Sequence, residues 1–523
     1  MQRSLATAVG ALALLAACGE GARPRSIGDG SASDAEDHLG ETDADVLVST
    51  DAMADADVSV ISVTTDAMAN QADGSETGVP IVHAWLTTPD LASHLTQQPD
   101  VETTPSGAAD LTFDDSSRLQ TIDGFGAALT DTSAYLLVNA LTPTTRAQVM
   151  ADLFSRTTGI GLSLVRLPMG SSDFTDCSCT YSYDDGVADP TLAGFSTAHD
   201  DAYIIPGILQ AQSINPQMKF FANPWSPPAW MKTNGSMLGT VDGGAGTLQA
   251  NDDDPLAQYF VRFLQDYIAD GVSVWAITPQ NEPSVARDYP GMSWSASDEA
   301  DFIANHLAPA LADAGLADIK ILGGDDVGAS LSFAQTLFAN AGSSLYATAW
   351  HCYHGLGDMT AIHDAYPDTP LYMTECSTGA SGIAGDATEQ VLVSMANWAS
   401  GAVLWNIALD TNGGPKMGEG CVGCTGLVTI DSSSGATSYT LNYYELAQFS
   451  KFVAPGAERV AHAGGNGISA EAFRNPDGTY VLVAYNPGDA SVTFSVRWDN
   501  AGSFRYALAA GATVTFTSLD AGM

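Results

Sequence analysis

Two glutamates follow short apolar runs that have the length of β-strands. Glu282 is the last residue before the proline that ends the stretch Ser273–Pro283, and Glu375 is the last residue of the stretch Pro370–Glu375. Because proline cannot donate to a sheet ladder, we expect the first strand to stop at Pro283. In a barrel of parallel strands both carboxylates would lie at the carboxyl-terminal rim, where such barrels keep their chemistry. Two carboxyl groups at one rim can act as a general acid and a nucleophile on one bond.

Eight apolar runs of strand length, including these two, alternate with helical segments. The best specified helix is expected to begin at Asp254-Pro255 and to end at Gly271, with apolar side chains along one face. Helices between such strands are typical of a parallel sheet, and eight units favour a (β/α)8 TIM barrel over an open sheet. The expected strands are a segment near Gly124, Leu162–Pro168, Lys219–Trp225, Val274–Asn281, Ile319–Gly323, Ala347–His351, Leu371–Glu375 and Ala402–Asn406.

After Asn406 the pattern changes to alternation with a period of two residues. Asp477-Gly478 is a hairpin signal between such runs. We therefore expect a catalytic barrel over residues 122–425 and an attached β-sandwich over residues 426–523. The predicted strands of the sandwich are Tyr480–Tyr485, Val492–Trp498, Phe504–Leu508 and Thr513–Thr517.

Residues 1–18 have the features of a lipoprotein signal peptide. Arg3 supplies a positive charge, and the apolar run Leu5–Leu15 is too short to span a bilayer permanently. The following Leu15-Ala-Ala-Cys18 is similar to a bacterial lipobox, which implies cleavage before Cys18 and lipidation of its sulfur. An ordinary secretory signal is the alternative. We expect an exported protein that is lipid-anchored to a bacterial membrane, in the periplasm or at the cell surface, or is secreted.

Residues 19–78 are expected to form an acidic disordered linker. Residues 31–60 carry nine acids and no Lys or Arg, and their mutual repulsion opposes collapse. The formal net charge of the whole chain is −43, which disfavours binding to nucleic acid or to an anionic membrane surface. Membrane contact is therefore expected only through the lipidated N-terminus. The sequence does not indicate an oligomeric state.

Six cysteines remain beyond Cys18. Export permits disulfides, which we prefer over a zinc site for the two close pairs, although the pairing stays open. The other two cysteines follow adjacent barrel strands and are interpreted as packed thiols. No metal and no other cofactor is expected. The close pairs are Cys177 with Cys179 and Cys421 with Cys424, and the remaining two are Cys352 and Cys376.

The stretch Asp123–Asp131 reads Asp-Gly-Phe-Gly-Ala-Ala-Leu-Thr-Asp. It lacks the third glycine and the strand-loop-helix context of a nucleotide-binding loop. Together with Asn281-Glu282-Pro283 and Glu375, it resembles glycoside hydrolase family 30, the glucosylceramidase-like retaining β-glycosidases, in particular secreted bacterial members. The similarity runs roughly from Val79 to the C-terminus. In that family, strands before the barrel join the sandwich, so residues 79–121 are expected to contribute to it in part.

The resemblance implies a double displacement in which Glu282 is the acid/base and Glu375 is the nucleophile. Retaining enzymes hold these two carboxyl groups about 5–5.5 Å apart. Asn281 is expected to bind the sugar 2-hydroxyl, with a strand-end cap as the alternative. Arg166 lies in an apolar run and needs a carboxylate partner. Glu375 would supply that partner, and a structural ion pair elsewhere is the alternative.

Further positions match residues that line the family's sugar site. Trp225 and Trp405 match substrate contacts at strand ends. Asp131 matches an acid that binds sugar hydroxyls in the minus-one subsite, although without the family it would be interpreted as a helix cap.

His351 and Tyr353 also match positions that line the active site, and the tyrosine hydroxyl can bond the nucleophile. A metal interpretation of His351 and His354 is weak because no third ligand stands at a recognisable spacing. Asp325-Asp326 is a further candidate for the same polar network.

The predicted substrate is a β-glucoside or a glucan. Glucosylceramidase or exo-β-glucosidase activity is the first prediction, and an endo-β-1,6-glucanase or a β-xylosidase of the same family is the alternative. A non-catalytic carbohydrate-binding lipoprotein is disfavoured because both glutamates are present. A serine hydrolase is disfavoured because the sequence has no Gly-x-Ser-x-Gly elbow. The segment from Lys416 to Cys424 departs from the mammalian-type pattern, which leaves the aglycone specificity open.

Overall fold

A computed structural model describes residues 81–518 apart from residues 105, 106, 108, 327–330, 380–384, 419 and 499–501. The predicted signal peptide, Cys18 and the acidic linker therefore lie outside the described residues. Among the residues that are described, no helix has the length and apolar character needed to cross a membrane.

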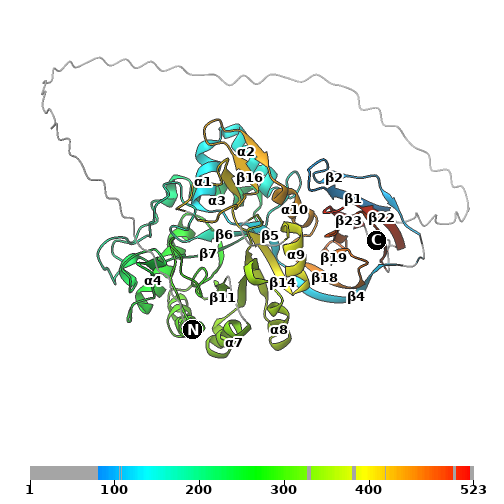
Figure 1. Cartoon of the computed structure of the whole chain (residues 1–523). Coiled ribbons are helices and arrows are strands. Elements are labelled where there is room, and N and C mark those ends of the chain that lie inside the picture. The colour runs from blue at the N-terminus through cyan, green and yellow to red at the C-terminus, as the bar shows by residue number, and fades with distance from the viewer. Residues whose placement is uncertain are drawn as a thin grey trace, which may run out of the picture. The chain divides into compact units, whose positions relative to one another are not determined.

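Eight strands form a closed parallel barrel in the middle of the chain (Figure 1). Neighbouring strands pair in the order β5-β14-β13-β12-β11-β10-β7-β6. A parallel bridge between Ala128 and Arg166 closes the ring between β5 and β6. The predicted TIM barrel is confirmed. Its strands are β5 (Gly124–Ala127), β6 (Leu164–Pro168), β7 (Lys219–Asn223), β10 (Val274–Ile277), β11 (Lys320–Asp326), β12 (Ala347–His351), β13 (Leu371–Glu375) and β14 (Ala399–Leu404).

Packed side chains fill the interior of the barrel, so it is a core and not a channel. This leaves the carboxyl-terminal rim as the place where polar groups can meet a substrate. The interior cluster consists of Leu164, Phe221, Ala276, Leu322, Ala347, Ala349, Tyr372 and Val403.

The strand that precedes Glu282 is shorter than predicted. β10 ends at Ile277, and Thr278 donates one further backbone bond, to Ala222 of β7. Pro279 follows and has no N–H to donate, so the ladder stops there. The prediction that the strand continues to Pro283 was therefore wrong.

The helices alternate with the barrel strands. The predicted helix after β7 begins at Asp253, with Asp252 as N-cap, so its predicted start at Asp254-Pro255 was wrong. Pro255 is tolerated because the N–H groups of the first turn have no intrahelical acceptor. The helices are α1 (Asp131–Tyr135), α2 (Pro143–Phe154), α3 (Ile204–Ile214), α4 (Asp253–Ala269), α5 (Ala296–Phe302), α6 (Ala308–Asp313), α7 (Leu331–Ala341), α8 (Asp358–Ala365), α9 (Ala387–Ala396) and α10 (Leu441–Ser450).

The β-sandwich takes strands from both sides of the barrel in sequence. In Figure 1 the blue strands β1 and β4 lie beside the orange and red C-terminal strands; β1 pairs with β23 and β4 pairs with β18. A C-terminal β-sandwich, as predicted, is confirmed. Its strands are β1 (Ile81–Thr87), β2 (Thr96–Gln97), β3 (Val101–Glu102), β4 (Leu111–Ile122), β18 (Ala457–Gly464), β19 (Ser469–Arg474), β20 (Tyr480–Tyr485), β21 (Val492–Trp498), β22 (Gly502–Leu508) and β23 (Thr513–Ser518).

A separate small sheet lies between the barrel and β18 in sequence. β15 (Ala408–Asp410), β16 (Val428–Ile430) and β17 (Thr437–Tyr439) form it, and α10 then packs against α9 and β5. The predicted boundary after residue 425 falls between β15 and β16 of this sheet. Strands of the sandwich resume only at Ala457.

Three disulfides are present among the described residues. The two close pairs are bonded internally. The interpretation of the other two cysteines as packed thiols was wrong, because the ends of two adjacent barrel strands bring their Cα atoms to 5.2 Å. The bonds are Cys177–Cys179, Cys352–Cys376 and Cys421–Cys424.

Candidate active site

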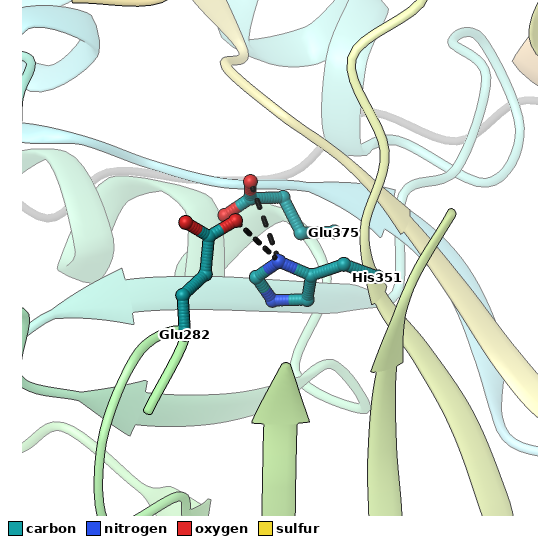
Figure 2. A group of neighbouring side chains, drawn as sticks. All are labelled: Glu282, His351 and Glu375. Carbon is teal, nitrogen blue, oxygen red and sulfur yellow. Dashed lines mark hydrogen bonds and ion pairs between the residues drawn. The ribbon is translucent and has the colours of Figure 1, made fainter. Parts of the chain in front are cut away.

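Glu282 and Glu375 converge with His351 at the carboxyl-terminal rim of the barrel (Figure 2). One oxygen from each carboxylate and one nitrogen of His351 all lie within 4.8 Å of one another. Glu375 ends β13 and His351 ends β12, whereas Glu282 lies in the loop after β10. Both glutamates are buried. This separation suits direct attack, because enzymes that place a water between the carboxyls need about 6.5–9.5 Å.

Arg166 on β6 joins the groups around Glu375. Its fully buried guanidinium donates to Glu375 Oε2, and to Asn281 Oδ1 and Asp325 Oδ2 at 2.7 Å each. Burial opposes the charge, but the carboxylates of Asp325 and Glu375 outweigh it and raise the pKa of Arg166 above its ordinary value. The structure therefore contains the ion pair between Arg166 and Glu375 that the sequence led us to expect.

Asp325, at the end of β11, accepts several hydrogen bonds within this network. Its carboxylate accepts from Thr278 at 2.8 Å and from Thr374 at 2.6 Å, besides Arg166. Burial favours the neutral acid, but Arg166 and His351 outweigh it and lower the pKa of Asp325 below its ordinary value. A buried carboxylate that stays ionised in this way fixes the positions of its cationic partners.

His351 bridges the three carboxylates. Its Nδ1 lies 3.1 Å from Glu282 Oε1 and 3.7 Å from Glu375 Oε1, and its Nε2 lies 3.2 Å from Asp325 Oδ1. Burial opposes the charge, but Glu375, Asp325 and Glu282 outweigh it and raise the pKa of His351 to about 10. The imidazolium at neutral pH donates from both nitrogens.

A protonated His351 has no lone pair for a metal ion. Glu282, His351 and Glu375 form the one group of metal-ligand type found among the described residues. Arg166 already supplies a cation to Glu375. The donor set therefore suits a carboxylate pair held by hydrogen bonds, and we assign no metal to it.

Tyr353 completes the surroundings of Glu375. Its hydroxyl donates to Glu375 Oε1 at 2.6 Å, while Arg166 donates to Oε2. Burial, reinforced by Glu375, raises the pKa of Tyr353 well above its ordinary value, so the hydroxyl keeps its proton. Both oxygens of Glu375 thus face a donor, which stabilises the ionised carboxylate that a nucleophile must be.

Trp225 and Trp405 meet at the same rim. Their rings stack at 5.1 Å between centroids, and the Arg166 guanidinium carbon lies 4.7 Å from the centroid of Trp225. Phe174 packs edge-on against Trp405 at 5.9 Å. Both tryptophans are almost fully buried, so they form a wall that keeps water from Arg166 and leave only a small part of each ring for a sugar.

Asp131 contacts a different set of residues from those around the glutamates. Its Oδ1 accepts from the Asp176 backbone at 2.7 Å, and its Oδ2 is shared by Tyr181 at 2.9 Å, Tyr203 at 3.1 Å and His199 at 2.8 Å. Oδ1 therefore has one protein donor and Oδ2 has three. These contacts tie Asp131 to the loop that follows β6, and its expected binding of sugar hydroxyls stays a prediction.

Two residues near the glutamates were missed from the sequence. Asp173, five residues beyond β6, is buried; that burial and the charge of Glu375 raise its pKa to about 7. Tyr289 packs against the aromatic wall, and burial with the charges of Glu282 and Asp173 raises its pKa. The available signal was the position of both in loops that follow barrel strands at the catalytic rim.

Two residues of the rim have a strained backbone. Glu282 has φ of 48° and Asp325 has φ of 53°, both in the left-handed region. The Glu282 N–H donates to the Asp325 carbonyl oxygen at 2.9 Å, so each strained residue holds the other. Non-glycine residues in this region persist where surrounding contacts enforce them, which is common at active sites.

Two buried carboxyl groups within direct-attack distance, beside a cationic network at a barrel rim, define a retaining glycosidase. Residues 122–453 match the glycosyl hydrolase family 30 TIM-barrel domain, and residues 456–516 match the glycosyl hydrolase family 30 beta sandwich domain. The chain belongs to glycosyl hydrolase family 30, a family of retaining enzymes. The resemblance seen in the sequence is confirmed at the level of the family.

The relatives of this chain within the family are named for different activities. An endo-1,6-beta-D-glucanase of Aspergillus fumigatus is 37% identical over 417 residues, covering 74% of this chain and 83% of that protein. The lysosomal acid glucosylceramidase of Mus musculus is 30% identical over 417 residues, covering 74% of this chain and 79% of that protein. The solved structure of the endo-beta1,6-glucanase BT3312 has a TM-score of 0.74 at 30% identity, covering 84% of this chain and 99% of that chain.

Proposed function

We propose that this protein is an endo-acting β-1,6-glucanase that works by double displacement. The observation that carries the reaction is the convergence of Glu282 and Glu375 within 4.8 Å. The higher identity to endo-1,6-β-glucanases than to the mouse glucosylceramidase supports the linkage. This choice reverses the order of the two activities that the sequence suggested.

In the first step Glu375 attacks the anomeric carbon while Glu282 gives its proton to the leaving glycosidic oxygen. The bond between the anomeric carbon and that oxygen breaks as the glycosyl ester to Glu375 forms. Arg166 and Tyr353 hold the attacking carboxylate in place and keep it ionised until it reacts. The truncated glucan leaves with the proton from Glu282.

In the second step Glu282, now ionised, removes a proton from a water that attacks the same carbon. The ester bond breaks, Glu375 leaves as a carboxylate, and the sugar is released with its original β configuration. His351, held at 3.1 Å from Glu282, donates to the carboxylate in its ionised form. The imidazolium therefore stabilises the ionised form of Glu282 that acts as the base in this second step.

Two side chains are assigned to the sugar itself. Arg166 donates to Asn281 Oδ1, which leaves the Asn281 amide N–H groups for the sugar 2-hydroxyl. Asp173, buried near both glutamates, is assigned to bind sugar hydroxyls in addition to Asp131.

A cleft lined by hydroxyl and carboxyl groups as well as apolar side chains supports a saccharide as the leaving group. It has a volume of about 600 Å³ and begins at the two residues after Glu282. It lies between the starts of α4 and α5, at the carboxyl end of the strands. Hydroxyl and carboxyl groups suit sugar units better than the alkyl chains of a ceramide. The lining includes Pro283, Ser284, Trp294, Ser295, Asp298 and Asp301.

A substrate screen tests this function. The purified protein is assayed with β-1,6-glucan, β-1,3-glucan, glucosylceramide in detergent micelles, and aryl β-glucosides and β-xylosides. We expect β-1,6-glucan to give oligosaccharides of mixed length from the first minutes, and proton NMR to show the β-anomer first. Glucose as the sole early product indicates an exo enzyme. Hydrolysis of glucosylceramide without that of β-1,6-glucan contradicts the proposal and leaves a glucosylceramidase.

The location of the protein is part of the same proposal. The lipobox-like Leu15-Ala-Ala-Cys18 supports export and lipid anchoring through Cys18. In a bacterial host, labelled palmitate should enter the wild-type protein and not Cys18→Ser, and only the wild type should sediment with membranes. Equal labelling of both proteins contradicts the anchor.

A further inference from the structure

The Cys352–Cys376 disulfide lies directly against the catalytic centre. Cys352 stands between His351 and Tyr353, and Cys376 follows Glu375. Both cysteines are buried. One covalent bond thus connects the chain segments that carry the proposed nucleophile and two of the side chains that contact the glutamates.

The backbone hydrogen bonds between these two strands are disturbed at the same place. The β12–β13 register is regular from Thr348 to Trp350 and then shifts, so that His351 faces Glu375. Both strands end at this pair. Beyond it the sheet no longer fixes the distance between the two segments, and the disulfide joins them one residue further on.

The contacts between the two segments that the disulfide joins are short, and they involve the residues of the proposed reaction. Tyr353 lies beyond the disulfide on one segment and bonds Glu375, on the other, at 2.6 Å. His351 contacts Glu375 at 3.7 Å and Glu282 at 3.1 Å. A displacement of about 1 Å between reacting groups can cost about a hundredfold in rate.

We propose that the Cys352–Cys376 disulfide is a positioning device that holds Glu375 in register with Tyr353 and His351. This inference rests on the proposed role of Glu375 as nucleophile. It makes the activity sensitive to dithiol reductants: the S–S bond breaks, each sulfur becomes a thiol, and the dithiol is oxidised to its own disulfide. The two electrons and two protons come from that reductant.

The test compares two pairs of substitutions. The double variant Cys352→Ser/Cys376→Ser removes the positioning disulfide, and Cys177→Ser/Cys179→Ser removes a disulfide in the loop after β6 as a matched control. For the first variant we expect kcat on an aryl β-glucoside to fall about 10- to 100-fold with little change in KM. We also expect its pH–rate profile to move, because the contacts of His351 and Tyr353 with the glutamates change. The control should keep the wild-type kcat and pH profile.

Folding and catalytic rate are measured separately for each variant. Circular dichroism and thermal unfolding establish that each variant is folded. A folded Cys352→Ser/Cys376→Ser variant with wild-type kcat and pH profile overturns the inference. Where that variant does not fold, wild-type protein is treated with dithiothreitol under native conditions and its thiols are counted. A reversible loss of kcat on reduction supports the inference, and full activity with the bond open overturns it.

A mechanism-based label separates this inference from the proposed function. A 2-deoxy-2-fluoro-β-glucoside forms a slowly hydrolysed ester with the nucleophile, which peptide mass spectrometry locates. A label on a residue other than Glu375 overturns the assigned roles. A label on Glu375 that forms at the wild-type rate in the double variant overturns only the role of the disulfide.

Discussion

Tyr353 donates its hydroxyl hydrogen to Glu375 Oε1 at 2.6 Å. Arg166, on the opposite side, donates to Oε2 of the same carboxylate. One donor is neutral and half-buried, whereas the other is charged and fully buried. When Glu375 forms an ester its negative charge disappears, so these donors favour the free carboxylate and assist its departure in the second step. The nucleophile is thus held in the state from which it attacks and to which it returns.

Tyr353→Phe should lower kcat by about 10- to 100-fold. A hydrogen bond to a charged group contributes about 1.5–3 kcal/mol, and 1.36 kcal/mol is about tenfold in rate. The ring remains, so the thermal unfolding midpoint should stay close to that of the wild type. Initial rates on an aryl β-glucoside measure the effect. A wild-type kcat for this variant contradicts the role of the hydroxyl.

Glu375→Gln and Glu282→Ala should fail in different ways. Glu375→Gln cannot form the glycosyl ester, so turnover should be abolished for every substrate. Glu282→Ala loses the proton donor, so β-1,6-glucan should be affected far more than dinitrophenyl glucoside, whose leaving group needs no proton. Added azide should restore turnover of Glu282→Ala and release β-glucosyl azide, visible by NMR. An equal loss with every leaving group contradicts the role of Glu282.

The sequence predicted the barrel and the sandwich from repeated apolar patterns. Glu282 and Glu375 stood out because each follows an apolar run, whereas Trp225 and Trp405 were expected from the resemblance to the family. The sequence did not predict that Tyr181, Tyr203 and His199 would contact Asp131 Oδ2, since these partners lie 50 or more residues away in the long segment between β6 and α3. The same loop contains Asp173, whose burial depends on tertiary packing and not on local pattern.

The Cys352–Cys376 bond was missed for a related reason. Its cysteines are 24 residues apart, and only the parallel pairing of β12 with β13 brings them together. The start of α4 and the end of β10 were misplaced because each proline signal admits more than one position. Boundaries that depend on single residues are therefore less predictable than elements that depend on a repeated pattern.

Arg166→Met should destabilise the fold strongly. The side chain is fully buried, and its removal leaves the carboxylates of Asp325 and Glu375 without their charged partner. Loss of one member of a buried pair costs about 3–5 kcal/mol. Asp254→Asn, which breaks an exposed contact with His306, is the control, with an expected effect of about 0–1 kcal/mol. Urea unfolding measures both. Equal stabilities of the two variants contradict the anchoring role of Arg166.

At alkaline pH, Asp173→Asn should be more stable relative to the wild type than it is at acid pH, but it should bind the substrate less tightly. Burial and Glu375 raise the pKa of Asp173 in the folded protein from 3.8 to about 7. A group whose pKa is raised on folding contributes stability that is fully present below the unfolded pKa, here below pH 3.8. That contribution is lost as the pH rises through about 7. The neutral asparagine avoids this loss but accepts fewer hydrogen bonds from sugar hydroxyls.

Urea midpoints of wild type and Asp173→Asn, measured at several pH values between 4 and 9, give the difference in stability that belongs to this one group. The wild type should lose stability relative to Asp173→Asn between about pH 4 and pH 7, by an amount on the order of a few kcal/mol, and the difference should then level off. Over the same range Asp173→Asn should show a higher KM for β-1,6-gluco-oligosaccharides. A stability difference that does not change with pH means that Asp173 ionises as readily folded as unfolded. That result would contradict the burial of its carboxyl group.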